Sequence, residues 1–481
     1  MNGIVLSYTN DEAPSAFGVE QRGLAAEILG AGLRAADPAR AVARCLKRTD
    51  AGLIVANDSG AEVVIPRAAF QRALIVGCGK AAAAMGRAAE DILGDWLTGG
   101  MVTVKHGDVV PQTAGKIQLL AADHPVPGPA SEAAARAALA VLQQTRRGDL
   151  VLALVSGGGS ALWALPRPQL TLADKQSVTS LLLDAGAPIG EINTVRRCLS
   201  AVKGGQAALA VHPEARLVVL ALSDVPGDDP ATIASGPFSP NPTSPSDARV
   251  VLTKYGLTDR VPFAVRQLLE RGSAGQPELN LARFDPRRYT YVICGSNATA
   301  TAAAADAARS LGFITGVVAE PIIGEARLQA AAFIRRARQA QAAHPRQPCC
   351  LIGGGEVTVT IDGPCGTGGR NQEFALAAAL ELERPASAAA GLLVAALATD
   401  GNDGVTEAAG AFADSVTAAR ARAAGFAPQA ALAGHDAAPL FRALGDQIVT
   451  GRTGTNVMDL YIALTGAPEK PAQTTATVKA H

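Results

Sequence analysis

The chain has 481 residues, of which 48% are hydrophobic and 18% are charged, and its 43 Lys and Arg residues balance 43 Asp and Glu residues. This length exceeds what one ordinary hydrophobic core supports, so the composition predicts two globular domains and excludes a disordered chain. A formal net charge of zero argues against a nucleic-acid partner, which would require a basic surface.

The N-terminal sequence MNGIVLSYTNDEAP lacks the basic segment and the continuous apolar core of a signal peptide. The longest apolar stretches, such as residues 388–398, are short and interrupted by glycine, so we expect no membrane span. Seven scattered cysteines without a C-x-x-C pair indicate reduced thiols and argue against a zinc site. These features predict a cytoplasmic protein with no membrane partner.

The first glycine-rich turn, GCGKAA, follows an apolar run at residues 73–76 and opens an alanine-rich helical stretch. The outline G-x-G-x-x-A after a strand is typical of dinucleotide-binding folds, so an NAD(P)-dependent reductase is one hypothesis. That hypothesis needs an acidic residue after the next strand, but residues 101–104 are followed by Lys105 and His106. The turn itself carries Lys80, either a surface lysine on a tight turn or a positive charge beside a bound anion.

A second glycine-rich turn, SGGGS, follows the predicted strand at residues 149–155. Three consecutive glycines allow backbone N–H groups to converge on a phosphate without obstruction by side chains, although a plain turn would have the same sequence. The chain has no G-x-x-x-x-G-K-[ST] motif, so it is not a Walker-type NTPase. The candidate nucleotide-binding residues are Ser156, Gly157, Gly158, Gly159 and Ser160.

Two further apolar strands end in acidic turns. Residues 216–222 precede SDVPGDD, which contains Asp224, and residues 392–397 precede ATDGNDG, which contains Asp400. Loops at the carboxyl ends of strands are where α/β proteins bind ligands. Magnesium takes one or two carboxylates together with phosphate oxygens and water, so Asp224 and Asp400 are candidate metal ligands. Aspartates beside glycine are also ordinary turn residues.

The order strand, glycine turn, helix recurs at residues 291–293, and the helical stretch after them contains Asn297, a further candidate nucleotide-binding residue. This recurrence predicts an α/β fold with a doubly wound, Rossmann-like parallel sheet and helices on both faces. Residues 357–361 follow the glycine-rich segment 353–356 and alternate like a strand. We therefore expect a local antiparallel element there and a mixed sheet in the second half.

The proline-rich segment at residues 236–247 is the best candidate for a linker. It predicts a first domain at residues 1–245, a second at residues 246–465, and a flexible polar tail at residues 466–481. Residues 451–465 could instead pack back on the first domain.

The segment GTGGRNQEF places Arg370 in the first turn of a predicted helix. An arginine at a helix start opposes the macrodipole, a cost that a bound anion would offset. A surface arginine without function is the alternative.

Long motifs in family order resemble the class II glycerate 2-kinases. The first part of the chain contains LVLALVSGGGSALWALP, INTVRRCLSAVKGGQAA and LSDVPGDDPATIASGPFSPNPTS; GGGEVTVTIDG, GTGGRNQEFALAAAL, LATDGNDGVTEAAGA and GRTGTNVMDLYIAL are similar to the family's MOFRL domain. The resemblance implies two α/β domains with the active site in the cleft between them. It also implies phosphorylation of D-glycerate at the 2-hydroxyl by ATP and Mg²⁺. The family's proposed catalytic lysine and arginine correspond to Lys80 and Arg370.

Phosphoryl transfer depends mainly on positioning and on neutralising the charge of the moving group. We therefore expect the SGGGS loop to cradle the ATP phosphates, Lys80 to reach the γ-phosphate, and Asp224, Asp400 or both to hold Mg²⁺. Arg370 would pair with the glycerate carboxylate or the transferring phosphoryl group, since its planar fork suits either anion. Asp224 or Glu356 would accept the hydroxyl proton.

Two other hypotheses remain open at this point. One is an NAD(P)-dependent hydroxypyruvate reductase, a name sometimes given to members of this family. The other is a sugar-phosphate-binding regulator on the same sheet, although the sequence contains no recognisable DNA-binding module. The oligomeric state is not fixed by the sequence, and a homodimer is one candidate.

Overall fold

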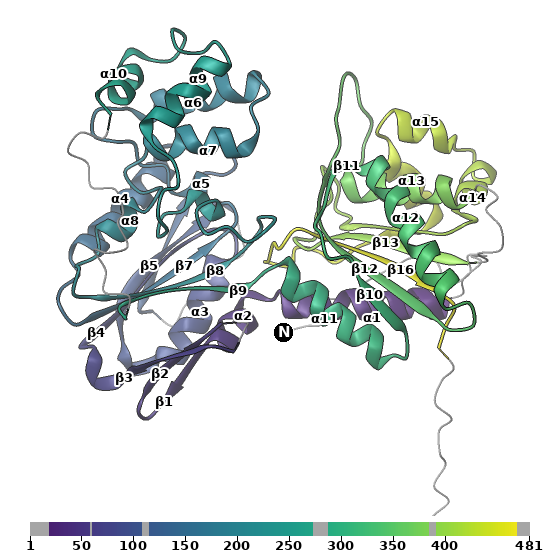
Figure 1. Ribbon diagram of the computed structural model, residues 1–481, viewed down its shortest axis with the longest axis horizontal. Coiled ribbons are helices and arrows are strands. Elements are labelled where there is room, and N and C mark those ends of the chain that lie inside the picture. Colours follow the sequence, from purple (N-terminus) through teal and green to yellow (C-terminus); the bar gives the residue numbers. More distant parts are fainter. Residues whose placement is uncertain (1–18, 58–59, 108–114, 273–286, 384–390, 469–481) are drawn as a thin grey trace, which may run out of the picture. The chain divides into compact units, whose positions relative to one another are not determined.

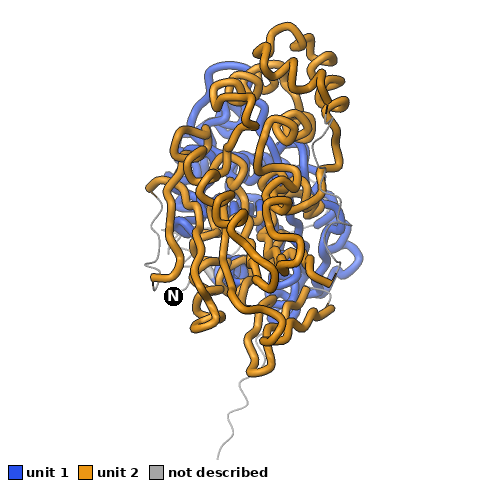
Figure 2. The backbone as a smooth tube through the Cα atoms, turned by 90° about the vertical axis from the view of Figure 1, so that its left-hand side faces the viewer, with its two compact units in different colours: residues 1–34, 298–453, 458–481 blue, residues 35–297, 454–457 orange. Residues whose placement is uncertain are grey.

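The computed structural model describes residues 19–57, 60–107, 115–272, 287–383 and 391–468. The chain divides into two units, coloured separately in Figure 2: unit 2 comprises residues 35–297 and 454–457, and unit 1 the remainder. Within the described ranges, no helix is both long enough and apolar enough to cross a membrane.

Unit 2 is built on six parallel strands in the order β6-β5-β4-β7-β8-β9 (Figure 1). This is the strand order of doubly wound nucleotide-binding sheets, in which the order reverses between β4 and β7. The parallel sheet predicted from apolar runs followed by glycine is confirmed, and β6 is an additional strand that was not predicted. The strands are β4 (Arg72–Cys78), β5 (Leu97–Lys105), β6 (Ile117–Ala122), β7 (Asp149–Ser156), β8 (Arg216–Leu222) and β9 (Tyr289–Gly295).

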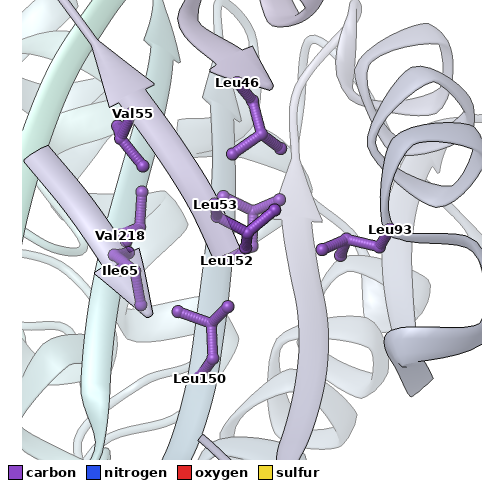
Figure 3. A pocket seen from close by; sticks show the side chains of 8 residues that line it. All are labelled: Leu46, Leu53, Val55, Ile65, Leu93, Leu150, Leu152 and Val218. Atoms are coloured by element: carbon purple, nitrogen blue, oxygen red, sulfur yellow. The ribbon is translucent and has the colours of Figure 1, made fainter. Parts of the chain in front are cut away.

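Different layers cover the two faces of this sheet. Val151 of β7 belongs to an apolar cluster with α4, whereas Leu150 and Leu152 point toward α3 and a three-stranded antiparallel sheet (Figure 3). Because side chains alternate along a strand, a strand that is apolar throughout is buried on both faces. The covering elements are α2 (Pro38–Cys45), β1 (Leu46–Thr49), β2 (Gly52–Ala56), β3 (Glu62–Pro66), α3 (Ala82–Leu93) and α4 (Pro129–Gln143).

A helical layer with its own apolar cluster lies next to the carboxyl edge of the parallel sheet (Figure 1). Its helix α7 contacts the short turn η3, which in turn contacts α5, the helical turn directly after β7. The layer therefore borders the loops that follow the strands. These elements are α5 (Gly159–Leu162), α6 (Leu172–Asp184), α7 (Ile189–Cys198), η3 (Ile233–Ser235), α9 (Pro245–Lys254) and α10 (Phe263–Arg271). Helix α8 (Gln206–Leu209) instead packs beside α4.

The proline-rich segment at residues 236–247 is packed into unit 2 and does not link the units. Phe238 is fully buried, its ring lies 6.0 Å from that of Trp163, and its carbonyl accepts a 2.5 Å hydrogen bond from Tyr289 Oη. These contacts keep α9, α10 and β9 in unit 2, so the units divide near residue 297 and not at the expected residue 245.

Unit 1 contains a mixed seven-stranded sheet in the order β10-β12-β16-β13-β14-β15, with β11 also paired to β12. The predicted mixed sheet is confirmed, and its antiparallel character comes from β16, which lies between β12 and β13 and runs against both. The strands are β10 (Ile314–Val317), β11 (Ile322–Glu325), β12 (Cys349–Thr358), β13 (Leu392–Ala398), β14 (Gly410–Ala413), β15 (Gln447–Ile448) and β16 (Asp459–Thr465).

Helices cover both faces of this sheet (Figure 1). Helix α1 packs between β16 and α11: a Cβ added at Gly32 would lie 2.8 Å from Leu460 Cδ1 and 3.0 Å from the carbonyl oxygen of Ala300. The first described residues, 19–34, thus belong to unit 1, contrary to the expected domain at residues 1–245. The helices are α1 (Val19–Ala35), α11 (Asn297–Ser310), α12 (Ala326–Ala343), α13 (Arg370–Glu383), α14 (Thr417–Ala423), α15 (Pro428–Ala433) and α16 (Ala437–Leu444).

The glycine-rich segment at residues 353–356 is the middle of one continuous strand, β12, and does not separate two elements as expected. A Cβ at Gly353 would lie 2.4 Å from Ile322 Cδ1, and one at Gly355, where φ is +151°, would lie 2.2 Å from the carbonyl oxygen of Ile322. The glycines allow β11 to approach β12 closely, so they serve strand packing here.

The chain crosses between the units near its C-terminal end. Thr455 Oγ1 donates a 2.6 Å hydrogen bond to the carbonyl oxygen of Ala36, and Asn297 Nδ2 donates one of 2.9 Å to that of Val457. Residues 454–457 thus belong to unit 2, after which β16 enters the sheet of unit 1. Most of the predicted flexible tail, residues 469–481, lies outside the described residues.

Candidate functional site

The two glycine-rich turns predicted from the sequence meet at the carboxyl ends of β4 and β7. The backbone N–H of Lys80 donates a 2.8 Å hydrogen bond to the Gly157 carbonyl, and that of Ala81 donates one of 3.0 Å to Ser156 Oγ. A Cβ at Gly79, where φ is +130°, would lie 2.1 Å from the same hydroxyl. This junction is the point where the strand order reverses, the usual ligand position in such sheets.

The SGGGS loop can contain only glycine at its centre. A Cβ at Gly157 would lie 2.0 Å from Asp224 Oδ2, and one at Gly158, where φ is +80°, would lie 3.2 Å from Lys80 Cγ. Among the described residues, no acceptor binds the backbone N–H groups of Gly158 and Gly159. Close approach by neighbouring groups and open N–H donors are what a phosphate cradle requires.

Charged side chains gather around this loop. Burial raises the pKa of Asp224, and the charge of Lys80 acts in the opposite direction. Burial, assisted by the charges of Lys80 and Lys105, lowers the pKa of His124 to about 4, so its imidazole is neutral at pH 7. His124 Nε2 lies 3.1 Å from the position of a Cβ at Gly158. An aspartate, a lysine and a neutral histidine thus border the SGGGS loop.

Sequence reasoning missed His124. It lies just beyond β6, the strand that was not predicted, at the same carboxyl edge as Lys80. The segment DHPVPG after an apolar run has the same pattern as the acidic turns that were recognised, and it could have identified this residue.

In unit 1, Arg370 is held by a bidentate ion pair at the start of α13. Its Nε and Nη2 donate hydrogen bonds of 2.5 and 2.8 Å to Asp459, and Nη2 lies 3.1 Å from Glu356 Oε1. Burial lowers the pKa of Arg370, but the hydrogen bonds and charge of Asp459 outweigh it and raise the pKa above its usual range. The side chain of Arg370 is 28% exposed and that of Asp459 is fully buried, so Asp459 fixes a permanent, partly accessible cation.

Asp459 was also missed, because it is one acidic residue at the beginning of the apolar strand β16. The only sequence signal is the position of this aspartate directly before the buried run LYIALT, where a charge needs a partner.

The helix that carries Arg370 is anchored by Asp403. The backbone N–H groups of Asn371 and Gln372 donate hydrogen bonds of 2.9 and 2.8 Å to its carboxylate, and burial raises its pKa to about 6. A Cβ at Gly369 would lie 2.3 Å from Asp403 Cγ, which explains the glycine in GTGGRNQEF. Asp403 therefore caps α13 and positions Arg370.

Two candidate residues, Asp400 and Asn297, have contacts with the backbone. Asp400 follows β13 in unit 1, and its Oδ1 accepts a 3.1 Å hydrogen bond from the backbone of Asn402. Asn297 follows β9 at the carboxyl edge of the parallel sheet, with its amide bound to the carbonyl of Val457. In the described part of the chain, no three His, Cys, Asp or Glu side chains are grouped to hold a metal ion. Asp224 is the carboxylate that lies beside the SGGGS loop, a donor set that suits Mg²⁺ completed by phosphate oxygens and water.

Comparisons with known proteins cover nearly all of the chain. Residues 24–270 match the family described as domain of unknown function DUF4147, and residues 349–459 match the MOFRL family. A glycerate 2-kinase from Pyrococcus horikoshii is 37% identical over 446 residues, 92% of this chain and 97% of that protein. A D-glycerate 2-kinase from Thermotoga maritima is 36% identical over 413 residues, 85% of this chain and 94% of that protein.

A relative from Agrobacterium vitis, provisionally named hydroxypyruvate reductase, is 40% identical over 405 residues, 84% of this chain and 89% of that protein. Among solved structures, a glycerate kinase from Thermotoga maritima matches with a TM-score of 0.79 and 34% identity, covering 93% of this chain and 100% of that one.

Proposed function

The chain belongs to the glycerate kinase family that combines a DUF4147 domain with a MOFRL domain, and from this membership we propose the reaction that it catalyses. The proposed reaction transfers the γ-phosphoryl group of ATP to the 2-hydroxyl of D-glycerate and gives 2-phosphoglycerate and ADP. The relatives named glycerate 2-kinase support the substrate and the position of transfer. The observation that carries the proposal is the junction of Lys80 with the SGGGS loop at the switch point of the parallel sheet.

In unit 2, the SGGGS loop would bind the phosphates of ATP. The open N–H groups of Gly158 and Gly159 supply donors, and Lys80 supplies a positive charge from the adjoining turn. Lys80 would bind the γ-phosphate and balance the charge that develops as the phosphoryl group moves. The neutral imidazole of His124 would provide a further hydrogen bond at the same loop.

Asp224 would hold Mg²⁺ beside this loop, and Asp400 is the second carboxylate that we propose as a ligand. A bound Mg²⁺ would neutralise phosphate oxygens and orient the transferred group. Asn297, at the carboxyl edge of the same sheet as Lys80, remains our candidate for a contact to the nucleotide.

In unit 1, Arg370 would act as a preoriented cation for the transferring phosphoryl group. Asp459 occupies the Nε and Nη2 edge of the guanidinium, which leaves the Nη1 hydrogens to bind an anion. Asp459 is thus a positioning residue. Glu356 is 40% exposed beside the same guanidinium, and we propose it, with Asp224 as the alternative, as acceptor of the hydroxyl proton.

A hydroxypyruvate reductase is the second candidate, because relatives from Agrobacterium vitis carry that name. The structure offers an argument against it. Strand β5, the neighbour of β4, ends in Lys105, where a dinucleotide site needs an acidic residue for the ribose hydroxyls. A cytoplasmic location is proposed with the kinase reaction, supported by seven free cysteines, six of them buried.

The test is a coupled assay that detects ADP when the purified protein receives D-glycerate, ATP and Mg²⁺. We expect turnover that requires all three components and falls about 10²- to 10⁴-fold in Lys80→Ala and Arg370→Ala. Near-normal kcat/KM in both variants would show that these residues are wrongly assigned. Reduction of hydroxypyruvate by NADH or NADPH, without phosphorylation of glycerate, would contradict the proposed function.

A further inference from the structure

An arginine in the helical layer of unit 2 has no carboxylate partner among the described residues. Arg196 lies in the last turn of α7 and is partly buried, and the interaction of its guanidinium is a long contact of 3.5 Å from Nη1 to Asn193 Oδ1. The neighbouring Arg197, in contrast, is buried and donates to the carbonyl of Ala231 at 3.0 Å and to Thr243 Oγ1 at 3.4 Å. Arg197 therefore serves the fold, whereas no described carboxylate pairs with the guanidinium of Arg196.

A chain of polar side chains connects Arg196 to the SGGGS loop. Asn193 Oδ1, which accepts from Arg196, also accepts a 3.1 Å hydrogen bond from Ser235 Oγ. Ser235 Oγ in turn lies 2.9 Å from Ser160 Oγ, the last residue of the loop. Ser235 is held in η3 at a φ of +62°, a backbone conformation that costs free energy at a residue other than glycine. Such strained residues cluster at ligand sites.

Two buried lysines lie close enough to Arg196 for its charge to disfavour their protonation. Lys203 Nζ donates hydrogen bonds of 2.7 and 2.9 Å to the carbonyls of Ser160 and Trp163, and so fixes the end of the SGGGS loop. Burial, followed by the charge of Arg196, lowers the pKa of Lys175 to about 7 and that of Lys203 well below its usual value. The positive charge of Arg196 therefore acts on both lysines through a region with little water.

Among the described residues, no carboxylate shifts the pKa of Arg196, which burial alone lowers. Glu132 acts on Lys175, but its Oε1 is already 2.5 Å from Arg136 Nη2. Uncompensated positive charge in a partly buried position strongly favours an anion.

We propose that Arg196, with Asn193 and the hydroxyls of Ser160 and Ser235, forms the subsite that binds the carboxylate of the acceptor substrate. This inference rests on the proposed kinase function and names the residues of unit 2 that select a 2-hydroxy acid. In such a substrate the carboxylate is bonded to the carbon that carries the reacting hydroxyl. A carboxylate bound beside Ser160 therefore places that hydroxyl next to the loop that we assign to the ATP phosphates.

The assignment also separates the roles of two arginines. Asp459 and Glu356 occupy the Nε and Nη2 side of Arg370 and leave only Nη1 for an anion, whereas the guanidinium of Arg196 has no carboxylate partner among the described residues. The planar fork of an arginine binds a carboxylate through two parallel hydrogen bonds. Among the described residues, the fork of Arg196 makes only the 3.5 Å contact from Nη1 to Asn193, so we assign the carboxylate to Arg196 and the transferring phosphoryl group to Arg370.

The test compares Arg196→Met, Arg196→Lys and a control, Arg249→Met, which removes an exposed arginine from helix α9 of the same unit. KM and kcat are measured for D-glycerate, for ATP and for D-glyceramide, in which a neutral amide replaces the carboxylate. We expect KM for D-glycerate to rise about 30- to 100-fold in Arg196→Met, with KM for ATP within about threefold of wild type. Preference for glycerate over glyceramide should collapse in this variant, Arg196→Lys should recover part of it, and the control should resemble wild type.

Direct binding separates failure of this inference from failure of the proposed function. Calorimetric titration with D-glycerate alone should give a Kd that Arg196→Met weakens by a similar factor, even if the wild-type protein showed no turnover. Circular dichroism and thermal melting establish that each variant is folded. The inference is overturned if folded Arg196→Met binds D-glycerate as wild type does, or if the substitution raises KM for ATP and leaves that for glycerate unchanged.

Discussion

Replacing Asp459 with Asn should test whether the orientation of Arg370 matters for catalysis. Asn retains the volume and one carbonyl oxygen of Asp459, but it removes the negative charge. It also turns an NH₂ group toward one of the two guanidinium donors, which now lie 2.5 and 2.8 Å from carboxylate oxygens. Tyr461 Oη, 3.2 Å from the same carboxylate, can rotate its proton to adapt.

The expected loss of stability follows from burial. Breaking a fully buried ion pair costs about 3–5 kcal/mol, and one charge-assisted hydrogen bond contributes about 1.5–3 kcal/mol. Asp459 is fully buried, but Arg370 is 28% exposed and keeps Glu356 at 3.1 Å. Water and Glu356 should absorb part of the loss, so we expect unfolding free energy to fall by about 2–3 kcal/mol. Misdirection of Arg370 should lower kcat about 10²-fold.

The matched control is Asp446→Asn, which breaks a second buried ion pair of unit 1. Asp446 is fully buried and accepts hydrogen bonds of 2.5 Å from Arg22 and 2.8 Å from Arg420. Urea denaturation and steady-state kinetics with D-glycerate are measured for both variants. Asp446→Asn should lose comparable stability and keep kcat within about threefold of wild type. If both variants lost kcat equally, or if Asp459→Asn were fully active, the reasoning about Arg370 would be refuted.

Three further predictions concern unit 2. Gly157→Ala places a Cβ 2.0 Å from Asp224 Oδ2, so KM for ATP should rise about 10- to 100-fold, while the circular dichroism spectrum stays that of wild type. An unchanged KM for ATP would contradict the proposal that the SGGGS loop binds the ATP phosphates. Lys80→Arg should keep the charge but retain less than a tenth of wild-type kcat, because Lys80 packs closely beside Gly158 and a planar guanidinium is wider than an amino group. Wild-type kcat in this variant would show that charge alone suffices. Burial and the charge of Arg196 lower the pKa of Lys175 to about 7, and Glu132 opposes them. A bound carboxylate would favour the protonated lysine, so KM for glycerate, measured from pH 6 to 9, should increase above pH 7; a flat profile would exclude this coupling.

Most of the parallel sheet was predictable because its strands have a pattern that can be recognised in the local sequence. Strands β4, β7, β8 and β9 are short apolar runs that end in, or are followed by, glycine or serine, and residues 216–222 correspond to β8 from end to end. Strands buried on both faces need such continuous runs, so the pattern survives without knowledge of the partners. The order of the strands was not readable, since pairing depends on contacts between distant parts of the chain.

Glycine and proline gave wrong predictions of a turn and a linker where tertiary packing determines their role. Gly353 and Gly355 look like a turn, but they lie inside β12 because β11 passes too close for side chains. The prolines around Phe238 look like a linker, but the ring of Phe238 fills the core of unit 2. In both places the local preference is outweighed by contacts with residues far away in the sequence.

The candidate site shows the same division. The glycine turns around Lys80 and Ser156 were recognisable, and the meeting of these turns follows from parallel strands having a common carboxyl edge. Asp459 was not recognisable, because its importance comes from Arg370, which is 89 residues away in the sequence. Arg196 owes its importance to the polar side chains that connect Asn193 through Ser235 to Ser160. His124 could have been found only from the turn DHPVPG. Single polar residues in apolar strands and helices give no local signal of such partners.

The most direct test of the glycerate 2-kinase function is identification of the product by ³¹P NMR after incubating the protein with D-glycerate, ATP and Mg²⁺. We expect ADP and 2-phosphoglycerate in equal amounts, and no product when D-glycerate is omitted. Formation of 3-phosphoglycerate, or no phosphorylated product at all from a folded protein, would contradict it.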